Sequence, residues 1–243
     1  MIKQESTNID NKIVSFLMIG QSNMAGRGNF EDVEPIVNEK CFVFRMGDWT
    51  MMTEPVNPDR DIFKKEFHSG IGLASSFADE VSKYFNMNVG LIPCANGGTK
   101  VSQWQPGGML YDHAVMMAKL AMRVSEFGGI IWHQGENDCI EFDKNAYRKQ
   151  FLNTMTNIRK DLNAEKLPLI IGEISESITP GWNLGDNPKY MNELLHSLKS
   201  ELPYCGIAKA TDLELKSDGI HFTSASYREL GKRYFEEYKK LTK

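Results

Sequence analysis

A serine lies on a glycine-flanked turn directly after the first long apolar run of the chain. The turn reads Gly20-Gln21-Ser22-Asn23-Met24-Ala25-Gly26 and follows the apolar run at residues 13–19. A serine at the carboxyl end of a strand lies near backbone N–H groups that can stabilise an oxyanion, as a nucleophilic serine requires. The turn is not the G-x-S-x-G elbow, because Met24 stands where the last glycine would be. Taken alone, Ser22 is either a nucleophile, an N-cap residue or part of a glycine-rich phosphate loop, although G-x-G-x-x-G and the Walker pattern are absent.

An aspartate and a histidine lie three residues apart near the end of the chain, in Asp218-Gly219-Ile220-His221. A nucleophilic serine needs a general base, and the base needs an acceptor that fixes its tautomer and stabilises the imidazolium. Of the five histidines, only His221 has an aspartate three residues before it. A lone D-x-x-H is usually a solvated loop pair, so the assignment depends on Ser22 lying at the same edge of the fold.

Two further blocks follow apolar runs. Asn96-Gly97-Gly98-Thr99 has two glycines that allow close approach of the backbone to a ligand. An ordinary turn between a strand and a helix could have the same sequence. The run 132–138, Trp-His-Gln-Gly-Glu-Asn-Asp, supplies side-chain amides that can donate to an oxyanion. The alternative is a helix start whose acidic residues complement the dipole, which accounts for only part of the run.

Five apolar runs predict the strands that position these blocks, at residues 13–19, 89–93, 129–132, 169–174 and 206–210. They are apolar nearly throughout, which is typical of a parallel sheet covered on both faces. Helical periodicity lies between or after them, at residues 72–85, 112–126, 147–162, 191–202 and 225–241. This alternation predicts an α/β fold with a doubly wound, five-stranded parallel sheet, whose functional loops leave the carboxyl ends of the strands.

The composition indicates one globular domain over residues 1–243, in which residues 29–68 form a long insertion without clear periodicity. Hydrophobic residues make up 41% and charged residues 25%, and the net charge is 28 − 32 = −4, which disfavours nucleic acid as a partner. No apolar run approaches the about 18–20 residues of a membrane span, and no secretory signal is evident, so we expect a cytoplasmic protein, or a secreted or periplasmic one if a signal was removed. The four cysteines are expected to be reduced core residues.

The blocks in this order resemble the SGNH hydrolases. More closely, GQSNMAG, GGT and HQGEND are similar to the sialate O-acetylesterase branch, which includes the acetyl xylan esterases of carbohydrate esterase family 6. The resemblance spans residues 16 to about 238. It implies a flavodoxin-like three-layer αβα fold and hydrolysis of acetyl esters of carbohydrates, with a small-molecule or oligosaccharide ester as substrate and without metal or other cofactor.

The resemblance also implies roles for individual residues. Ser22 would be the nucleophile, His221 the general base and then acid, and Asp218 its orienting partner. The N–H groups of Ser22 and Gly98 would line the oxyanion hole. The third donor is an asparagine of G-x-N-D in the wider superfamily, here Asn137, and the glutamine of HQGE in the closer branch, here Gln134. We favour Gln134.

Other residues of the motifs have weaker assignments. Glu136 is a second carboxylate that would share the orienting of His221. Gln21, Asn23 and Trp104 are candidates for substrate binding, with Trp104 either stacking on a sugar ring or covering the core. The main alternative to an esterase is a catalytically silent carbohydrate-binding protein on the same fold.

Overall fold

A computed structural model of the chain describes residues 12–58, 68–178 and 180–243. Its strands are β1 Ile13–Gly20, β2 Cys41–Arg45, β3 Asp48–Met51, β4 Asn88–Pro93, β5 Glu126–His133, β6 Leu169–Gly172 and β7 Cys205–Ala208. Its α-helices are α1 Ser22–Ala25, α2 Leu73–Phe85, α3 Met109–Ala121, α4 Lys144–Asp161, α5 Asn187–Lys199 and α6 Ser224–Leu241. Short 3-10 helices lie in the loops, as η2 Phe30–Asp32, η3 Val101–Trp104, η4 Asp138–Glu141 and η5 Pro180–Trp182. The predicted strands and long helices are confirmed, with ends that shift by a few residues.

The strands form one sheet in the order β3-β2-β4-β1-β5-β6-β7. Every neighbouring pair is parallel except β2 and β3. The chain adds strands on one side of β1 up to β4 and then on the other side from β5 onward. Because the strand order reverses beside β1, the loops that leave the carboxyl ends of β1, β4 and β5 diverge from one another. Doubly wound sheets bind ligands at such a point.

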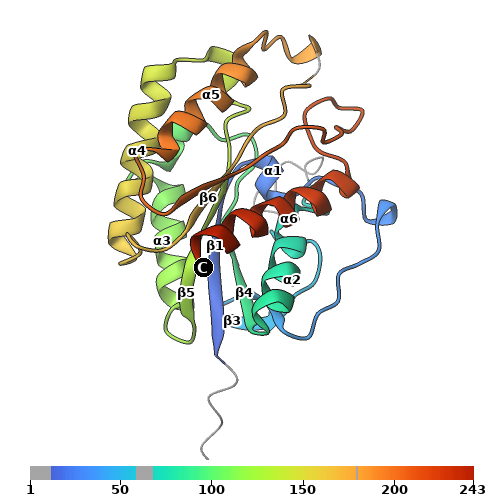
Figure 1. Ribbon diagram of the computed structural model, residues 1–243, viewed down its shortest axis with the longest axis vertical. Coiled ribbons are helices and arrows are strands. Elements are labelled where there is room, and N and C mark those ends of the chain that lie inside the picture. Colours follow the sequence, from blue (N-terminus) through green and yellow to red (C-terminus); the bar gives the residue numbers. More distant parts are fainter. Residues whose placement is uncertain (1–11, 59–67, 179) are drawn as a thin grey trace, which may run out of the picture.

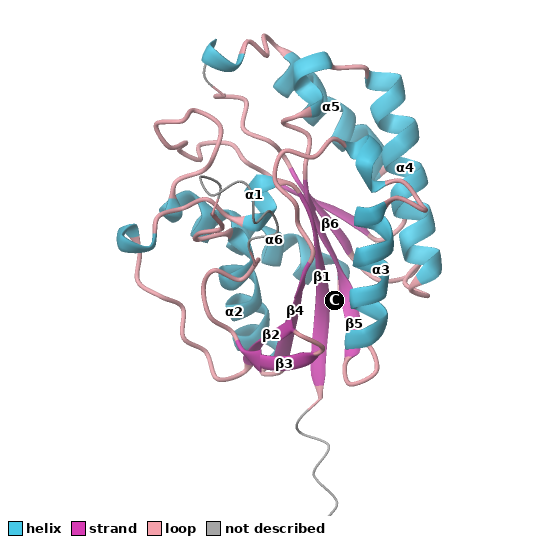
Figure 2. Ribbon diagram, turned by 180° about the vertical axis from the view of Figure 1, so that it is seen from behind, coloured by secondary structure: helices cyan, strands magenta, loops and turns pink. Residues whose placement is uncertain are grey.

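Helices cover both faces of the sheet and make three layers. α3, α4 and α5 lie on one face and α2 and α6 on the other (Figures 1 and 2). Along β1, Leu17 and Ile19 enter the core beneath α3, α4 and α5, whereas Phe16 and Met18 enter the core beneath α2 and α6. Successive side chains of a strand point to opposite faces, so a strand buried on both faces is apolar at every position.

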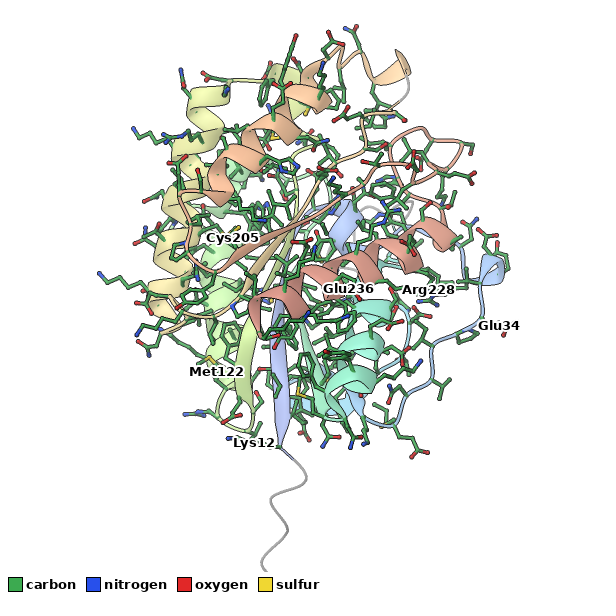
Figure 3. The ribbon with its side chains drawn as sticks, in the orientation of Figure 1. Lys12, Glu34, Met122, Cys205, Arg228 and Glu236 are labelled. Carbon is green, nitrogen blue, oxygen red and sulfur yellow. The ribbon has the colours of Figure 1, made fainter. Side chains whose placement is uncertain are left out.

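Residues 41–51, inside the predicted insertion, form a β-hairpin, so the sheet has seven strands rather than the five predicted. The turn residues Met46 and Gly47 have φ of +52° and +86°, the geometry of a tight hairpin turn. The usual signal for such a turn is Asn-Gly or Asp-Gly, and Met46-Gly47 lacks it. β2 pairs with β4, and Arg228 of α6 donates to the carbonyl of Glu34 at 3.0 Å and to the carboxylate of Glu54, which ties the segment to the fold (Figure 3). Positions 59–67 of the predicted insertion lie outside the described residues.

The four cysteines are buried and free, as predicted. No helix in the described part of the chain is long and apolar enough to cross a membrane. Among the same residues, no group of three His, Cys, Asp or Glu side chains is arranged to hold a metal ion.

Candidate active site

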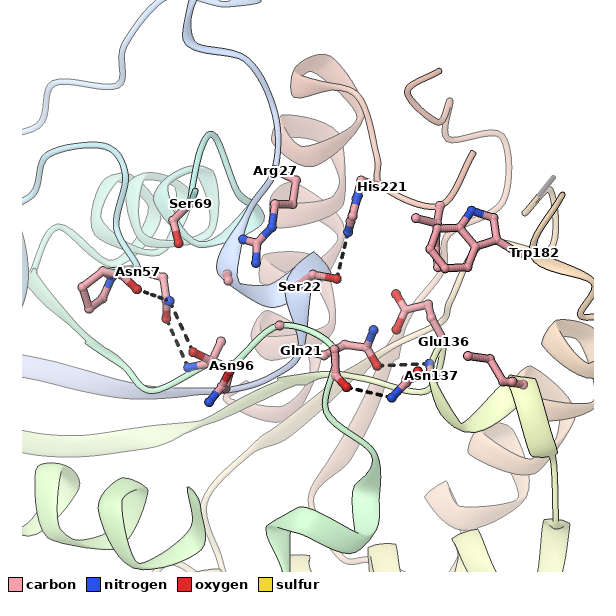
Figure 4. Close-up of a pocket in the computed structure, with 17 residues that line it drawn as sticks. Gln21, Ser22, Arg27, Asn57, Ser69, Asn96, Glu136, Asn137, Trp182 and His221 are labelled. Atoms are coloured by element: carbon pink, nitrogen blue, oxygen red, sulfur yellow. Dashed lines mark hydrogen bonds between the residues drawn. The ribbon is translucent and has the colours of Figure 1, made fainter. Parts of the chain in front are cut away.

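Four loops meet at the carboxyl edge of the sheet and line much of a cavity of about 270 Å³. Three of the loops follow β1, β4 and β5, and the fourth precedes α6. The volume is close to the lower limit of small-molecule sites, about 300 Å³. The predicted site residues that line the cavity are Gln21, Ser22, Gly98, Glu136, Asn137 and His221 (Figure 4).

Ser22 reaches the cavity through a tight turn at the end of β1. Gly20 has φ +136°, and a Cβ atom at this position would lie 2.1 Å from the carbonyl oxygen of His133 in β5. Only glycine allows the chain to leave β1 at this angle. The N–H of Gln21 then donates to the same carbonyl at 2.9 Å. The turn therefore places Ser22 at the first position of α1, lining the cavity with 7% of the residue exposed.

Ser22, His221 and Asp218 form a continuous line of hydrogen bonds. The Oγ of Ser22 lies 3.0 Å from the Nε2 of His221 (Figure 4). The Nδ1 of His221 lies 2.9 Å from the Oδ2 of Asp218. Because a carboxylate only accepts, the Nδ1 carries a proton, and in the neutral ring the Nε2 accepts the hydroxyl proton of Ser22. The structure thus brings together the three residues that the sequence connects.

The carboxylate of Asp218 is held by its own loop. Its Oδ1 accepts the N–H of Ile220 at 3.1 Å and the N–H of His221 at 3.0 Å, across a turn at Gly219 with φ +72°. Partial burial raises the pKa of Asp218, but the hydrogen bonds from His221 and Ile220 outweigh this effect, so the pKa lies below its ordinary value. Asp218 is therefore ionised at neutral and mildly acidic pH.

Two backbone N–H groups are available at the cavity. The N–H of Ser22 has no acceptor within α1, because it stands in the first turn of the helix. Gly98 has φ +71°, and its N–H donates to no acceptor within residues 12–58, 68–178 and 180–243. A Cβ atom on the neighbouring Gly97 would lie 3.6 Å from the Cβ of Ser22 and 2.6 Å from Nη2 of Arg27. The glycines thus let the loop after β4 pass close to Ser22.

The side-chain amide of Gln21 is oriented by donors from the loop after β5. Its Oε1 accepts from the Nε2 of Gln134 at 3.3 Å, from the N–H of Asn137 at 3.3 Å and from the N–H of Gly135 at 3.5 Å. With the oxygen held in this way, the Nε2 of Gln21 donates to no other described residue. Figure 4 shows the amide between Ser22 and Asn137, at the cavity.

The two amides expected to compete for the oxyanion are placed differently. Gln134 is fully buried, does not line the cavity, and donates from its Nε2 to the carbonyl of Thr99 at 3.0 Å and to two side-chain oxygens. Asn137 lines the cavity and donates from its Nδ2 to the carbonyl of Gly98 at 2.7 Å. The structure therefore brings Asn137 to the cavity, whereas Gln134 reaches it only through Gln21.

The buried carboxylate of Glu136 is connected to the loop of His221 through Asn23. The Nδ2 of Asn23 donates to the Oε1 of Glu136 at 2.5 Å and to the carbonyl of Ile220 at 3.2 Å. The Oδ1 of Asn23 accepts from the hydroxyl of Tyr227 at 2.6 Å. Asn23 thus holds the loop in place rather than lining the cavity, and Glu136 reaches the backbone beside His221 rather than its ring.

Glu136 also faces a buried histidine. Its Oε1 lies 3.5 Å from the Nε2 of His133, a distance suited to an ion pair and longer than most hydrogen bonds. The Nδ1 of His133 lies 3.0 Å from the hydroxyl of Tyr234, which donates to the carbonyl of Trp132 at 2.7 Å. Burial raises the pKa of Glu136, but His133 and Asn23 outweigh this effect, so the pKa lies below its ordinary value.

Trp104, a candidate for sugar stacking, is a core residue. It is fully buried, its Nε1 donates to the hydroxyl of Thr99 at 3.1 Å, and its ring packs against that of Trp132. An aromatic side chain that does line the cavity is Trp182 in η5, which is 42% exposed. No motif surrounds Trp182, and Pro180-Gly181 before it signals only a turn.

Asn57 is a second cavity residue that sequence reasoning missed, because it belongs to the segment predicted to be an irregular insertion. It lines the cavity and pairs with the backbone of Ala95, accepting the N–H at 3.1 Å and donating to the carbonyl at 3.3 Å. The segment after the hairpin therefore contributes one wall of the cavity.

The chain matches known carbohydrate esterases over nearly its whole length. The family model described as carbohydrate esterase, sialic acid-specific acetylesterase matches residues 12–240. A probable carbohydrate esterase from Arabidopsis thaliana is 30% identical, with 92% of this chain and 89% of that protein covered. A solved Arabidopsis thaliana structure has a TM-score of 0.83 at 27% identity, covering 94% of this chain and 98% of that one. The crystal structure of NanS shares the fold, with a TM-score of 0.74 at 16% identity and coverage of 95% and 97%. The chain belongs to the carbohydrate esterase family of sialic acid-specific acetylesterases, which are carboxylic ester hydrolases.

Proposed function

We propose that this protein hydrolyses O-acetyl esters of carbohydrates, of the sialic acid or xylan type, through an acetyl-enzyme formed on Ser22. The observation that carries the proposal is the line of hydrogen bonds from Ser22 through His221 to Asp218 beside the cavity. A serine hydroxyl is a weak nucleophile unless a base accepts its proton, and this line supplies both the base and its orienting carboxylate.

The reaction then proceeds in two halves. His221 takes the proton of Ser22 as the Oγ attacks the acetyl carbonyl carbon, and Asp218 stabilises the imidazolium that forms. The tetrahedral intermediate collapses when His221 protonates the sugar oxygen, which leaves as an alcohol. Water, activated by His221, next attacks the acetyl-Ser22 ester, and acetate leaves while the serine regains its proton.

The oxyanion of each tetrahedral intermediate needs donors at the cavity. We assign the N–H groups of Ser22 and Gly98 to this role, together with the Nε2 of Gln21. Support for Gln21 comes from its position beside Ser22 and from the three donors that fix its oxygen. Gln134 is then a positioning residue, because it contacts Gln21 and not the cavity.

Acetate release from a panel of O-acetylated sialic acids, acetylated xylo-oligosaccharides and acetylated monosaccharides tests the proposal. Activity that a serine-directed organophosphate abolishes, with the label recovered on Ser22, would support it. A folded protein that binds members of the panel but releases no acetate from any of them would instead support a catalytically silent carbohydrate-binding protein.

A further inference from the structure

The two ends of the cavity differ in chemistry. Figure 4 shows Asn57, Ser69 and Asn96 on one side of Ser22 and Trp182 on the other. Glu136 and Asn137 lie on the same side as Trp182, and Ile140 and Ile220 also line the cavity. A ligand bound across Ser22 therefore meets polar side chains on both sides and an aromatic ring on one side alone among the labelled residues.

The indole of Trp182 is held in a defined position although the residue is 42% exposed. Its Nε1 donates to the backbone carbonyl of Asp218 at 2.9 Å, so the only polar atom of the ring is satisfied. Single exposed aromatic residues are common and need no explanation. Trp182 differs because its ring edge is anchored to the loop that carries His221 while the residue lines the same cavity as Ser22. Ile140, which is 49% exposed, lines the cavity as well.

We propose that Trp182 is the platform on which the pyranose ring of the substrate stacks, so that the enzyme hydrolyses acetyl groups borne by a sugar ring with a higher kcat/KM than simple acetate esters. The inference rests on the proposed function, since it concerns the alcohol side of the same ester. The face of an indole is electron-rich and the C–H bonds on one face of a pyranose are apolar and slightly positive, so the two surfaces are complementary. Hydroxyl groups at the rim of the ring can meanwhile reach the polar side chains of the cavity.

The test compares two acetate esters that differ in the alcohol alone, ethyl acetate and a monoacetylated methyl xylopyranoside. Acetate release gives kcat and KM for the wild type, Trp182→Ala and Trp182→Phe. Trp182→Ala should lower kcat/KM for the xylopyranoside about five- to tenfold, the range expected for one aromatic contact, and leave ethyl acetate within about twofold. Trp182→Phe keeps an aromatic face but loses the hydrogen bond to Asp218, so it should recover most of the activity on the sugar ester. Tyr204→Ala serves as the matched control, because Tyr204 is 47% exposed and precedes β7 at the opposite edge of the sheet.

Each other outcome contradicts a defined part of the argument. Equal losses on both esters, in Trp182→Ala and in Trp182→Phe, would show that Trp182 only supports the Asp218 loop through its hydrogen bond, and would overturn the inference. Hydrolysis of ethyl acetate by the wild type without hydrolysis of the pyranoside would also overturn it, while leaving the serine esterase in place. A wild type that hydrolyses neither of these esters nor any member of the panel named above would contradict the proposed function itself.

Discussion

Replacing Gln21 tests which amide stabilises the oxyanion. In Gln21→Glu the side chain keeps its shape and the oxygen that Gln134 and Asn137 hold, but the N–H donor at the cavity becomes a carboxylate oxygen. Loss of one oxyanion-hole donor lowers kcat by about 10²–10³, or about 2.7–4 kcal/mol of transition-state stabilisation. The new negative charge also opposes the oxyanion, so kcat should fall by at least this factor while KM changes little.

The assay is steady-state hydrolysis of a chromogenic acetate ester, with the melting temperature of each variant as the check on folding. Asn137→Ala serves as control: it removes the hydrogen bond to the carbonyl of Gly98, so it should cost about 1 kcal/mol of stability and change kcat little. Gln134→Ala should lower kcat by less than Gln21→Glu, because it only loosens the support of Gln21. The reasoning is refuted if Gln21→Glu keeps the kcat of the wild type while Asn137→Ala or Gln134→Ala loses it.

Three further predictions concern the proposed catalytic triad of Ser22, His221 and Asp218. Ser22→Ala should lower kcat by about 10³ or more with an unchanged melting temperature, and near-normal turnover by a verified variant would exclude Ser22 as the nucleophile. The pKa of Asp218 is lower in the folded state than in the unfolded chain, so the ionised carboxylate stabilises the fold through its hydrogen bonds with His221. This contribution to the free energy of unfolding is fully present at pH values above the ordinary aspartate pKa of about 3.9, and it is lost as the pH falls through the pKa of Asp218 in the folded protein. The difference in melting temperature between the wild type and Asp218→Asn should therefore shrink between pH 7 and about pH 2, and a constant difference would contradict this interpretation. EDTA should leave turnover unchanged, because the described residues offer no three-ligand cluster, and a loss that one metal ion restores would contradict the serine mechanism.

The sheet and the hydrogen-bonded arrangement of Ser22, His221 and Asp218 were predictable from the sequence because local patterns encode both. Phe16 and Leu17 enter opposite cores, so β1 is apolar without interruption from Phe16 to Ile19, and such a run stands out from amphipathic helices. Ser22 and His221 each lie directly beside a recognisable element boundary, the end of β1 and the start of α6. The carboxyl edge of a parallel sheet then brings residues 199 positions apart into contact.

The side chains that surround these three residues were less predictable, because their orientation depends on tertiary contacts. Gln21, Gln134 and Asn137 all follow strands that end at the same edge, and spacing does not reveal which amide is already bonded. Trp104 is close in sequence to the glycine pair after β4, yet η3 turns it into the core. Trp182 lies on a loop between β6 and α5, where no periodicity or motif marks a residue as facing a cavity.

The hydrogen bond between Tyr234 and Trp132 fixes which nitrogen of His133 faces Glu136. Tyr234 donates its single hydroxyl hydrogen to the carbonyl of Trp132, so its hydroxyl oxygen must accept a hydrogen bond from the Nδ1 of His133. The Nδ1 of His133 therefore carries a proton. The Nε2 is then the ring atom that faces the Oε1 of Glu136, 3.5 Å away. Glu136 lines the cavity, so a tyrosine of α6 that lies outside the cavity sets the orientation of the histidine behind this carboxylate.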